Sequence, residues 1–299
     1  MSISVYKIKK WYKMMTGKSI YHVNQGMGTC YSKDEVEGYY NDLTEKVTRD
    51  SQDILVPQYY VDTGEKVFFS IGIFQYGLAA YDLFLKTGDE IYKKKLLACA
   101  SWAIENQQEN GGWVAFGYKE TESPYSSMAQ GEGISMLIRA HIVSREKSYI
   151  KAVHKAKDFM LMPIPAGGTT GYIDNGIYLY ESVGSPLILN GWIFSLWGLY
   201  DYYKFFGDKD VKQIVNKTLE SLKKKLGNFD TGYWSNYDEG GCICSPFYHK
   251  LHIAQLRVMH DLFDDAIYED YANKWESYEK NFWKSQYAFI KKAIQKILD

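Results

Sequence analysis

The segment "LILNGWIFSLWGLYDYYKFFGD", residues 187–208, decides the fold class. Its apolar and aromatic side chains recur every three or four residues, as at Trp192, Leu196 and Leu199, which is the spacing of one helix face. The closing Gly207–Asp208 pair predicts the end of this helix and the capped start of a second one. The segment therefore predicts a helix hairpin whose first helix packs in a core.

The same layout recurs in four places along the chain. The other three segments begin near "FFSIGIFQYGLAAYDLFLKTGD", "SSMAQGEGISMLIRAHIV" and "YHKLHIAQLRVMHDLFDD". Equivalent polar anchors, separated by 55, 60 and 62 residues, are Gln75, Gln130, Asn190 and His252. More charged second helices are expected near residues 89–108, 147–162, 208–226 and 266–284. Regular helix pairs predict an all-α fold, an (α/α) toroid or incomplete barrel of repeated hairpins with a less regular N-terminal segment.

We divide the chain at residue 62. Residues 1–62 are interpreted as an N-terminal helix and an extended segment that pack on the barrel, and residues 63–299 as the toroid. The first 18 residues, "MSISVYKIKKWYKMMTGK", predict a short basic amphipathic helix with Val5, Ile8, Tyr12 and Met15 on one face. We expect it to dock on the core, with peripheral contact to a membrane surface as the alternative.

Composition narrows the function classes. Aromatic residues make up 16% of the chain, with 27 Tyr, and aromatic faces suit ligands such as sugars. Lys and Arg number 35 against 36 Asp and Glu, so no basic surface suggests nucleic acid as a partner. No His, Cys or carboxylate cluster has a recognised ligand spacing, and the four cysteines form no C-x-x-C pair, so we expect no metal site. We also expect no cofactor. Reduced thiols in the cytoplasm are the simplest account of the cysteines. A homodimer is kept as an alternative to a monomer.

Six motifs carry a family resemblance that covers roughly residues 65–280. In chain order they are "IFQYGLAAYDLF", "NGGW", "YSSMAQGEGISMLIRA", "LNGWIFSLWGLYDYY", "DTGYWSNYD" and "FYHKLHIAQL". This order is similar to the C-terminal catalytic domain of D-glucuronyl C5-epimerases. The resemblance implies an (α/α) barrel with a cleft for a uronic-acid-containing glycan, and inversion of C5 of the uronic acid.

The resemblance also implies catalytic residues. Carried over position by position, they are Glu181 in "YLYESVGSPLILNG", Tyr237 in "SNYDE" and Tyr248 in "FYHKLH". Two positions depart from the family pattern. The tyrosine that follows the carboxylate in the family is missing from "ESV", although Tyr180 precedes it, and no arginine follows Tyr237 in "YDEGG".

Further residues are interpreted as substrate-binding. His249 or His252 would lower the pKa of Tyr248 and stabilise the charge that develops on the sugar carboxylate. Amides could bond sugar hydroxyls and aromatic rings could stack on the sugar, although internal packing is the alternative for each. The full set is Gln75, Trp113, Gln130, Tyr180, Asn190, Tyr233, His249 and His252.

Other function classes stay open at this point. A polysaccharide lyase begins with the same removal of the C5 proton. A glycoside hydrolase needs two carboxylates, and Asp230, Asp238 and Glu239 are present besides Glu181. A non-catalytic glycan-binding module could keep the fold without the chemistry.

Overall fold

The computed structural model describes residues 13, 23–61 and 64–298, so most of the predicted N-terminal amphipathic helix lies outside the described residues. The chain divides into two compact units. The larger unit is Gly28–Leu222, and the smaller unit contains the described residues before Gly28 and those from Lys223 onward. The boundary that we predict after residue 62 is not one of these division points and stays a prediction.

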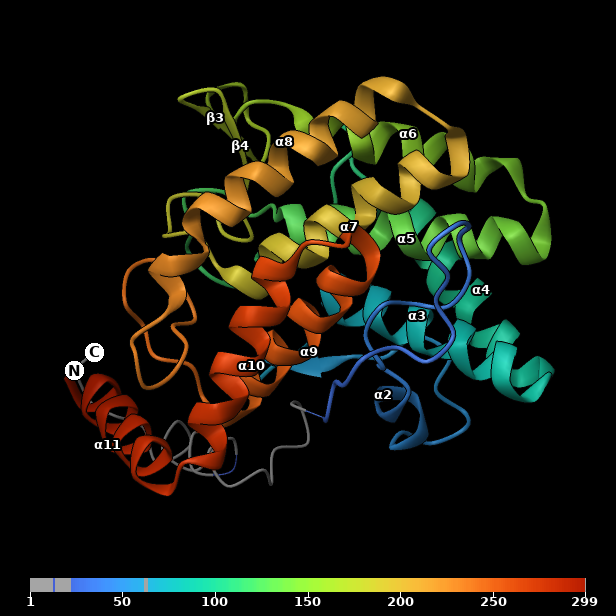
Figure 1. Ribbon diagram of the computed structural model, residues 1–299. Coiled ribbons are helices and arrows are strands. Elements are labelled where there is room, and N and C mark those ends of the chain that lie inside the picture. The colour runs from blue at the N-terminus through green and yellow to red at the C-terminus, as the bar shows by residue number, and fades with distance from the viewer. Residues whose placement is uncertain (1–12, 14–22, 62–63, 299) are drawn as a thin grey trace. The chain divides into compact units, whose positions relative to one another are not determined.

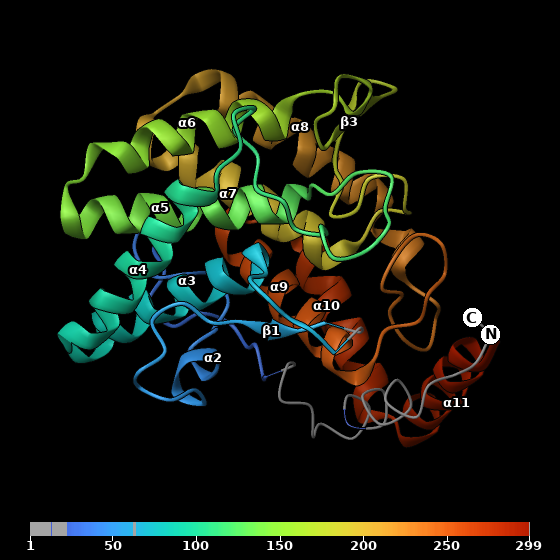
Figure 2. The same cartoon turned by 180° about the vertical axis from the view of Figure 1, so that it is seen from behind.

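The larger unit is built from helix hairpins (Figures 1 and 2). Its long helices are α3 (Ser70–Thr87), α4 (Glu90–Asn106), α5 (Ser127–Ser144), α6 (Lys147–Leu161), α7 (Leu189–Phe206) and most of α8 (Lys209–Lys225). Helix α3 packs on α4, α5 packs on α6, and α5 also packs on both α3 and α7. The helices expected from the periodic apolar spacing are therefore present. The bounds of α4, α6 and α8 lie within three residues of those predicted for the second helices of these hairpins.

Helix ends follow the local chemistry of the sequence. Helices α3 and α7 stop at Gly88 and Gly207, whose φ values of 70° and 69° lie in the left-handed region that glycine adopts readily. The next residue in each case begins a new helix. Asp89 accepts a hydrogen bond from the backbone N–H of Ile91 at 3.0 Å, and Asp208 accepts one from Val211 at 3.1 Å. These contacts confirm the predicted stop-and-cap pairs.

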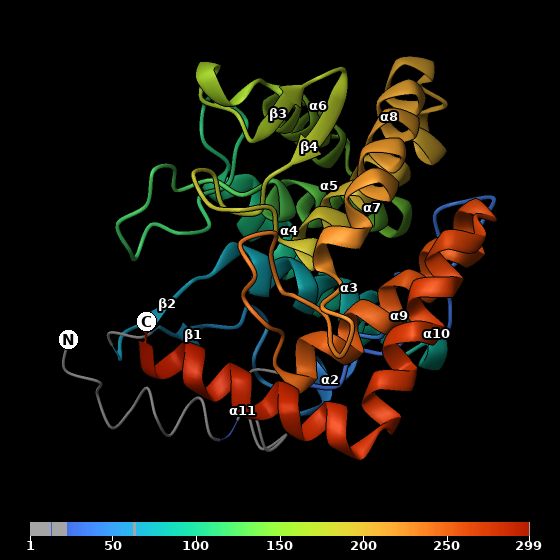
Figure 3. The ribbon, with the colours of Figure 1, turned by 60° about the vertical axis from the view of Figure 1, so that its left-hand side comes forward.

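Among its described residues, the smaller unit contains three long helices and a preceding loop (Figure 3). They are α9 (Pro246–Phe263), α10 (Ala266–Lys280) and α11 (Phe282–Leu298). Helices α9 and α10 form the fourth hairpin. The expectation of one helix near 266–284 is wrong at its end, because Asn281 has extended backbone angles and its side chain accepts the N–H of Lys284 at 3.1 Å. Asn281 thus ends α10 and caps α11.

Short elements fill the connections. A small antiparallel pair joins β1 (Tyr59–Tyr60) to β2 (Lys66–Val67), and a second joins β3 (Thr170–Ile173) to β4 (Gly176–Leu179). The β3–β4 turn places Asp174 and Asn175 at φ values of 48° and 63°, which Asn and Asp tolerate better than other non-glycine residues. The remaining short helices are α2 (Glu45–Thr48), η1 (Ile164–Ala166) and η2 (Leu226–Phe229).

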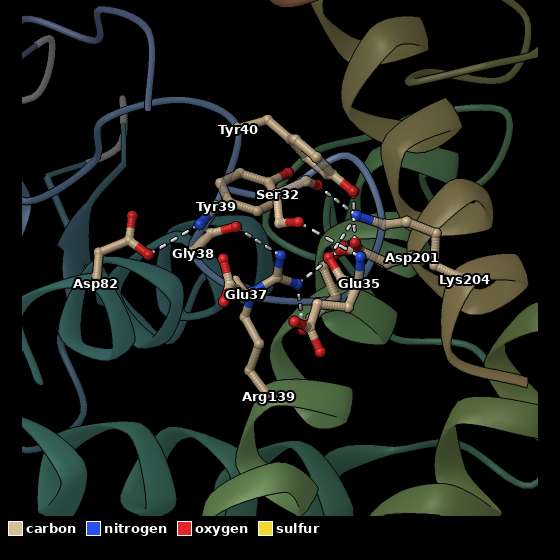
Figure 4. Close-up of polar contacts among 11 residues, drawn as sticks. Ser32, Glu35, Glu37, Gly38, Tyr39, Tyr40, Asp82, Arg139, Asp201 and Lys204 are labelled. Carbon is tan, nitrogen blue, oxygen red and sulfur yellow. Dashed lines mark hydrogen bonds and ion pairs between the residues drawn. The ribbon is translucent and has the colours of Figure 1, made fainter. Parts of the chain in front are cut away.

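A buried ion pair fastens the segment before α2 to the helices (Figure 4). Arg139 of α5 and Asp201 of α7 are both fully buried, and Arg139 Nη1 lies 2.6 Å from Asp201 Oδ2. The guanidinium also donates to the carbonyl oxygens of Glu37 at 2.7 Å and Gly38 at 3.0 Å. The hydroxyl of Tyr40 donates to the other oxygen of Asp201 at 2.6 Å. Residues 37–40 are therefore held on α5 and α7 by charge-assisted hydrogen bonds.

No helix in the described part of the chain combines the length and apolar character that crossing a membrane requires. Within residues 13, 23–61 and 64–298, no three His, Cys, Asp or Glu side chains come together as a candidate metal site.

Candidate active site

Glu181 lies in the loop between β4 and α7, in the larger unit. Its side chain covers the first turn of α7 so closely that a Cβ built on Gly191 would lie 2.1 Å from Glu181 Oε2. The N-cap of that helix is Ile188, whose side chain makes no capping hydrogen bond. A carboxylate at this place is stabilised by the positive end of the helix dipole. The absence of a side chain at Gly191 is what lets Glu181 occupy this position.

A second carboxyl group lies on the neighbouring inner helices. Glu132 of α5 is fully buried, and its Oε1 accepts a hydrogen bond from Gln75 Nε2 of α3 at 2.8 Å. Burial raises the pKa of Glu132 well above its usual range, and the charge of Glu181 raises it further. The hydrogen bond from Gln75 and the nearby Lys46 ammonium act in the opposite direction. Burial therefore favours the neutral form of Glu132, which shares the electrostatic environment of Glu181.

The smaller unit brings together two of the three predicted catalytic residues. The rings of Tyr237 and Tyr248 lie edge to face, with centroids 4.8 Å apart at 60°, and both side chains are half-buried. Tyr237 stands on a loop that doubles back on itself, because its N–H donates to the carbonyl of Cys242 at 2.6 Å. Tyr248 stands in the first turn of α9. Two motifs that are separate in the sequence thus present adjacent phenol groups.

Ser235 connects the loop that carries Tyr237 to His249. The backbone N–H of Ser235 donates to His249 Nδ1 at 3.2 Å, so the other ring nitrogen carries the proton and donates to the carbonyl of Trp275 at 3.0 Å. The indole of Trp234 stacks on the imidazole, with centroids 3.6 Å apart. These contacts hold α9, α10 and the loop together around one neutral imidazole.

The predicted cationic role of the two histidines is not supported. Both are fully buried, and burial lowers the pKa of His249 and of His252 to about 3. Neither imidazole carries a charge at neutral pH, so neither supplies the cation that would lower the pKa of Tyr248. Neither ring has exposed surface with which to contact a sugar. They are better explained as the polar support behind the tyrosine pair.

Trp113 and Gln130 also have no exposed side-chain surface. The indole N–H of Trp113 donates to the carbonyl of Ala103 at 2.8 Å, and the ring packs on Phe74. Gln130 Oε1 accepts the N–H of Trp113 at 3.1 Å and its Nε2 donates back to the Trp113 carbonyl at 3.2 Å. These contacts favour internal packing, which the sequence left open, over the predicted contact with substrate.

The remaining predicted residues are distributed over both units. Asn190 is buried in the first turn of α7, next to Gly191, and Gln75 is buried against Glu132. Tyr180 directly precedes Glu181 and is half-buried. Tyr233, in the loop of the smaller unit, is half-buried and packs on Tyr287 with ring centroids 4.7 Å apart. Gln75, Asn190 and Tyr180 thus belong with Glu181 in the larger unit, whereas Tyr233 belongs with the tyrosine pair.

Sequence reasoning missed Glu132. The available signal was an acidic residue between two glycines in "AQGEGISM", on a helix that is otherwise apolar and small. A helix of this composition is expected to be buried on all sides, and a carboxyl group in such a place is either paired or functional.

The sequence profile described as D-glucuronyl C5-epimerase C-terminus matches residues 107–277, which is more than half of the chain. The protein belongs to this family. All three predicted catalytic residues and the Glu132 position fall inside the matched range. The family assignment therefore agrees with the resemblance that the six motifs carry.

Two curated relatives are similar to this chain in sequence. D-glucuronyl C5-epimerase of Caenorhabditis elegans is 27% identical over 218 residues, which cover 63% of this chain and 35% of the relative. An uncharacterised protein of Methanocaldococcus jannaschii is 27% identical over 155 residues, 50% of each chain. The chain thus spans about a third to a half of the length of these relatives.

A solved structure supports the fold. Cellobiose 2-epimerase from Spirochaeta thermophila superposes with a TM-score of 0.50 and 12% identity, covering 91% of this chain and 67% of that one. At this identity the likeness concerns the fold alone. It confirms the predicted all-α fold class of the α/α toroids for this member of the C5-epimerase family.

Proposed function

We propose that the protein is a carbohydrate-active enzyme, an isomerase that inverts C5 of a uronic acid residue in a glycan. The observation that carries the proposal is the family membership together with the presence of Glu181, Tyr237 and Tyr248 at the matching motif positions. The structure adds that Tyr237 and Tyr248 are adjacent and half-buried rather than separate and enclosed.

The carboxylate of Glu181 and the phenol of Tyr248 have different roles in the proposed reaction. Inversion removes a proton next to the sugar carboxylate and returns one to the opposite face of the ring, so a base and an acid are both needed. A carboxylate stabilised at a helix N-terminus suits the base, which is the role proposed for Glu181. A phenol, whose reference pKa is about 10, suits the acid, and this is the role proposed for Tyr248.

No arginine follows Tyr237, so another group must stabilise the negative charge on the sugar carboxylate. His249 and His252 are neutral and supply no cation for the negative charge that develops on the carboxylate, so we propose neutral donors for its stabilisation. The hydroxyl of Tyr237 is the donor we propose for this role in the smaller unit. Neutral donors stabilise a carboxylate less than an arginine pair does, which favours a slow enzyme or a substrate with a different acidic group.

Deuterium exchange tests the proposal directly. The protein is incubated with uronic-acid-containing glycans in deuterated water, and C5 is examined for deuterium by NMR. Exchange without chain cleavage supports the epimerase, whereas an unsaturated sugar at the new chain end identifies a lyase. Absence of both over a panel of uronate glycans contradicts the proposal and favours a binding module.

A single hydroxyl removal tests the residue assignment. Tyr248→Phe should lower C5 exchange roughly 10²–10⁴-fold, the range of a general acid, with little change in Tm because the ring is kept. Tyr271→Phe is the matched control, since Tyr271 is half-buried in the same unit but lies in none of the six motifs. Exchange by the Tyr248 variant at the parent rate would assign that tyrosine to packing.

A further inference from the structure

Helix α11 carries an apolar stripe on its outer face. Trp283, Tyr287, Ile290 and Ile294 are 79%, 47%, 55% and 46% exposed. Their spacing of four, three and four residues places them on one side of the helix. Large apolar side chains are common singly at protein surfaces, but a row of four along one helix marks a contact surface.

The opposite face of α11 is anchored to the rest of the smaller unit. Gln295 accepts the N–H of Ile243 at 2.9 Å and donates to the carbonyl of Gly241 at 2.8 Å. Lys292 Nζ lies 3.0 Å from Cys242 Sγ, and Ala288 is buried. Because these contacts fix the orientation of the helix, the stripe faces outward in the folded unit.

The charged side chains of α11 have one sign. Residues 282–298 contain four lysines and no Asp or Glu. Lys292 is buried on the anchored face, and Lys284 Nζ donates to the carbonyl of Gly232 at 3.0 Å. Lys291 and Lys296 are exposed, and the ammonium of Lys291 lies 5.5 Å from the centre of the Tyr287 ring. A helix with Trp, Tyr and Ile on one face and lysines along its edges has the composition of helices that lie in a membrane interface.

We propose that α11 binds the surface of an anionic lipid bilayer. The stripe enters the boundary between headgroups and acyl chains, and Lys291, which is exposed beside Tyr287, pairs with lipid phosphates. A second copy of the chain fits less well, because two such helices would bring lysines together with no acidic residue on either to pair them. The proposal is independent of the proposed catalytic function.

The test is vesicle co-sedimentation of the full chain. Vesicles of phosphatidylcholine alone are compared with vesicles that also contain phosphatidylglycerol. The parent should bind the anionic vesicles, more weakly in high salt, and the double variant Trp283→Ser/Ile290→Ser should lose roughly tenfold in affinity. Tyr172→Ser/Ile173→Ser is the matched control, because this pair on β3 is about half exposed but lies in the other unit. Tm is measured for all proteins.

Several outcomes overturn the proposal. They are absence of binding to the anionic vesicles, equal binding to neutral vesicles, or equal binding by the double variant and the parent. A dimer in light scattering that the double variant abolishes would assign the stripe to a second copy. The control variant must not lose as much vesicle binding as the α11 double variant does. An equal loss would show that any exposed apolar side chain contributes.

Discussion

Glycine at position 191 gives a sharp test of the role of Glu181. Gly191→Ala adds one methyl group in the first turn of α7, where the backbone is helical and alanine is the better helix former by about 1 kcal/mol. The new Cβ would lie 2.1 Å from Glu181 Oε2 and 2.6 Å from Glu181 Cβ. The substitution therefore acts on one side chain while favouring the helix.

The expected size of the effect comes from the geometry. Ordinary contacts of a Cβ begin near 3.4 Å, so the carboxylate must move by about 1.3 Å. Displacing a catalytic group by about 1 Å lowers the rate roughly 10²-fold. We expect C5 exchange to fall by about that factor while Tm stays within a few degrees of the parent.

The assay is deuterium incorporation at C5 by NMR, with Tm from circular dichroism. Gly77→Ala is the matched control, since Gly77 lies inside α3 and its Cβ would meet the flexible Met136 sulfur at 2.5 Å. The double variant Glu181→Gln/Gly191→Ala completes a mutant cycle. If both changes act through the same carboxylate, the second should add little to the first.

Two results would refute the reasoning. Exchange at the parent rate by Gly191→Ala, with an unchanged Tm, would mean that the position of Glu181 does not matter to the chemistry. Full additivity in the cycle would mean that the methyl group acts elsewhere. A large fall in Tm that Gly77→Ala does not share would point to a structural role for the loop that carries Glu181.

Three further outcomes are expected. Asp201→Asn leaves Arg139 buried without its charge partner and should lower stability by about 3–5 kcal/mol, seen as a lower urea midpoint; an unchanged midpoint contradicts this. Burial raises the pKa of Asp82 to about 7. The protonated Asp82 carboxyl therefore contributes up to about 4 kcal/mol to the free energy of unfolding below pH 4, and this contribution is lost as the pH rises to 7. Asp82→Asn keeps the acceptor for the Tyr39 N–H and should flatten that slope in urea unfolding, whereas the parent slope in the variant would argue against it. Exhaustive chelation should leave C5 exchange unchanged, and restoration of a lost rate by one divalent ion would show the opposite.

The hairpin fold was predictable because each helix has its own pattern of residues in the sequence. Apolar spacing of three or four residues and the Gly-Asp pairs at 88–89 and 207–208 are local signals, and local signals are visible in one sequence. The anchors Gln75, Gln130, Asn190 and His252 all lie within the first two turns of α3, α5, α7 and α9, and their equivalence around the ring stays a prediction. The β3–β4 hairpin was missed because its two strands are only four residues each.

The site was predictable only in part, because burial depends on partners elsewhere in the chain. The choice of Tyr237 and Tyr248 as candidate residues follows from the motifs, but the burial of His249 depends on Trp234 and the Trp275 carbonyl, which no local pattern shows. Likewise, the role of Trp113 depends on the Ala103 carbonyl. A polar or aromatic residue next to a loop looks the same in the sequence whether it faces a ligand or the core.

The bonds of Arg139 and Asp201 also constrain the order of folding. Tyr40 reaches Asp201 across 161 residues of sequence, and Arg139 reaches the Glu37 carbonyl across 102. Residues 37–40 leave the ribosome early but cannot dock until α7 has been synthesised, and such long-range contacts slow folding. During that interval Arg139 lacks its charge partner Asp201. A nascent chain arrested before α7 should therefore be a preferred chaperone client, and one arrested shortly after it should be released.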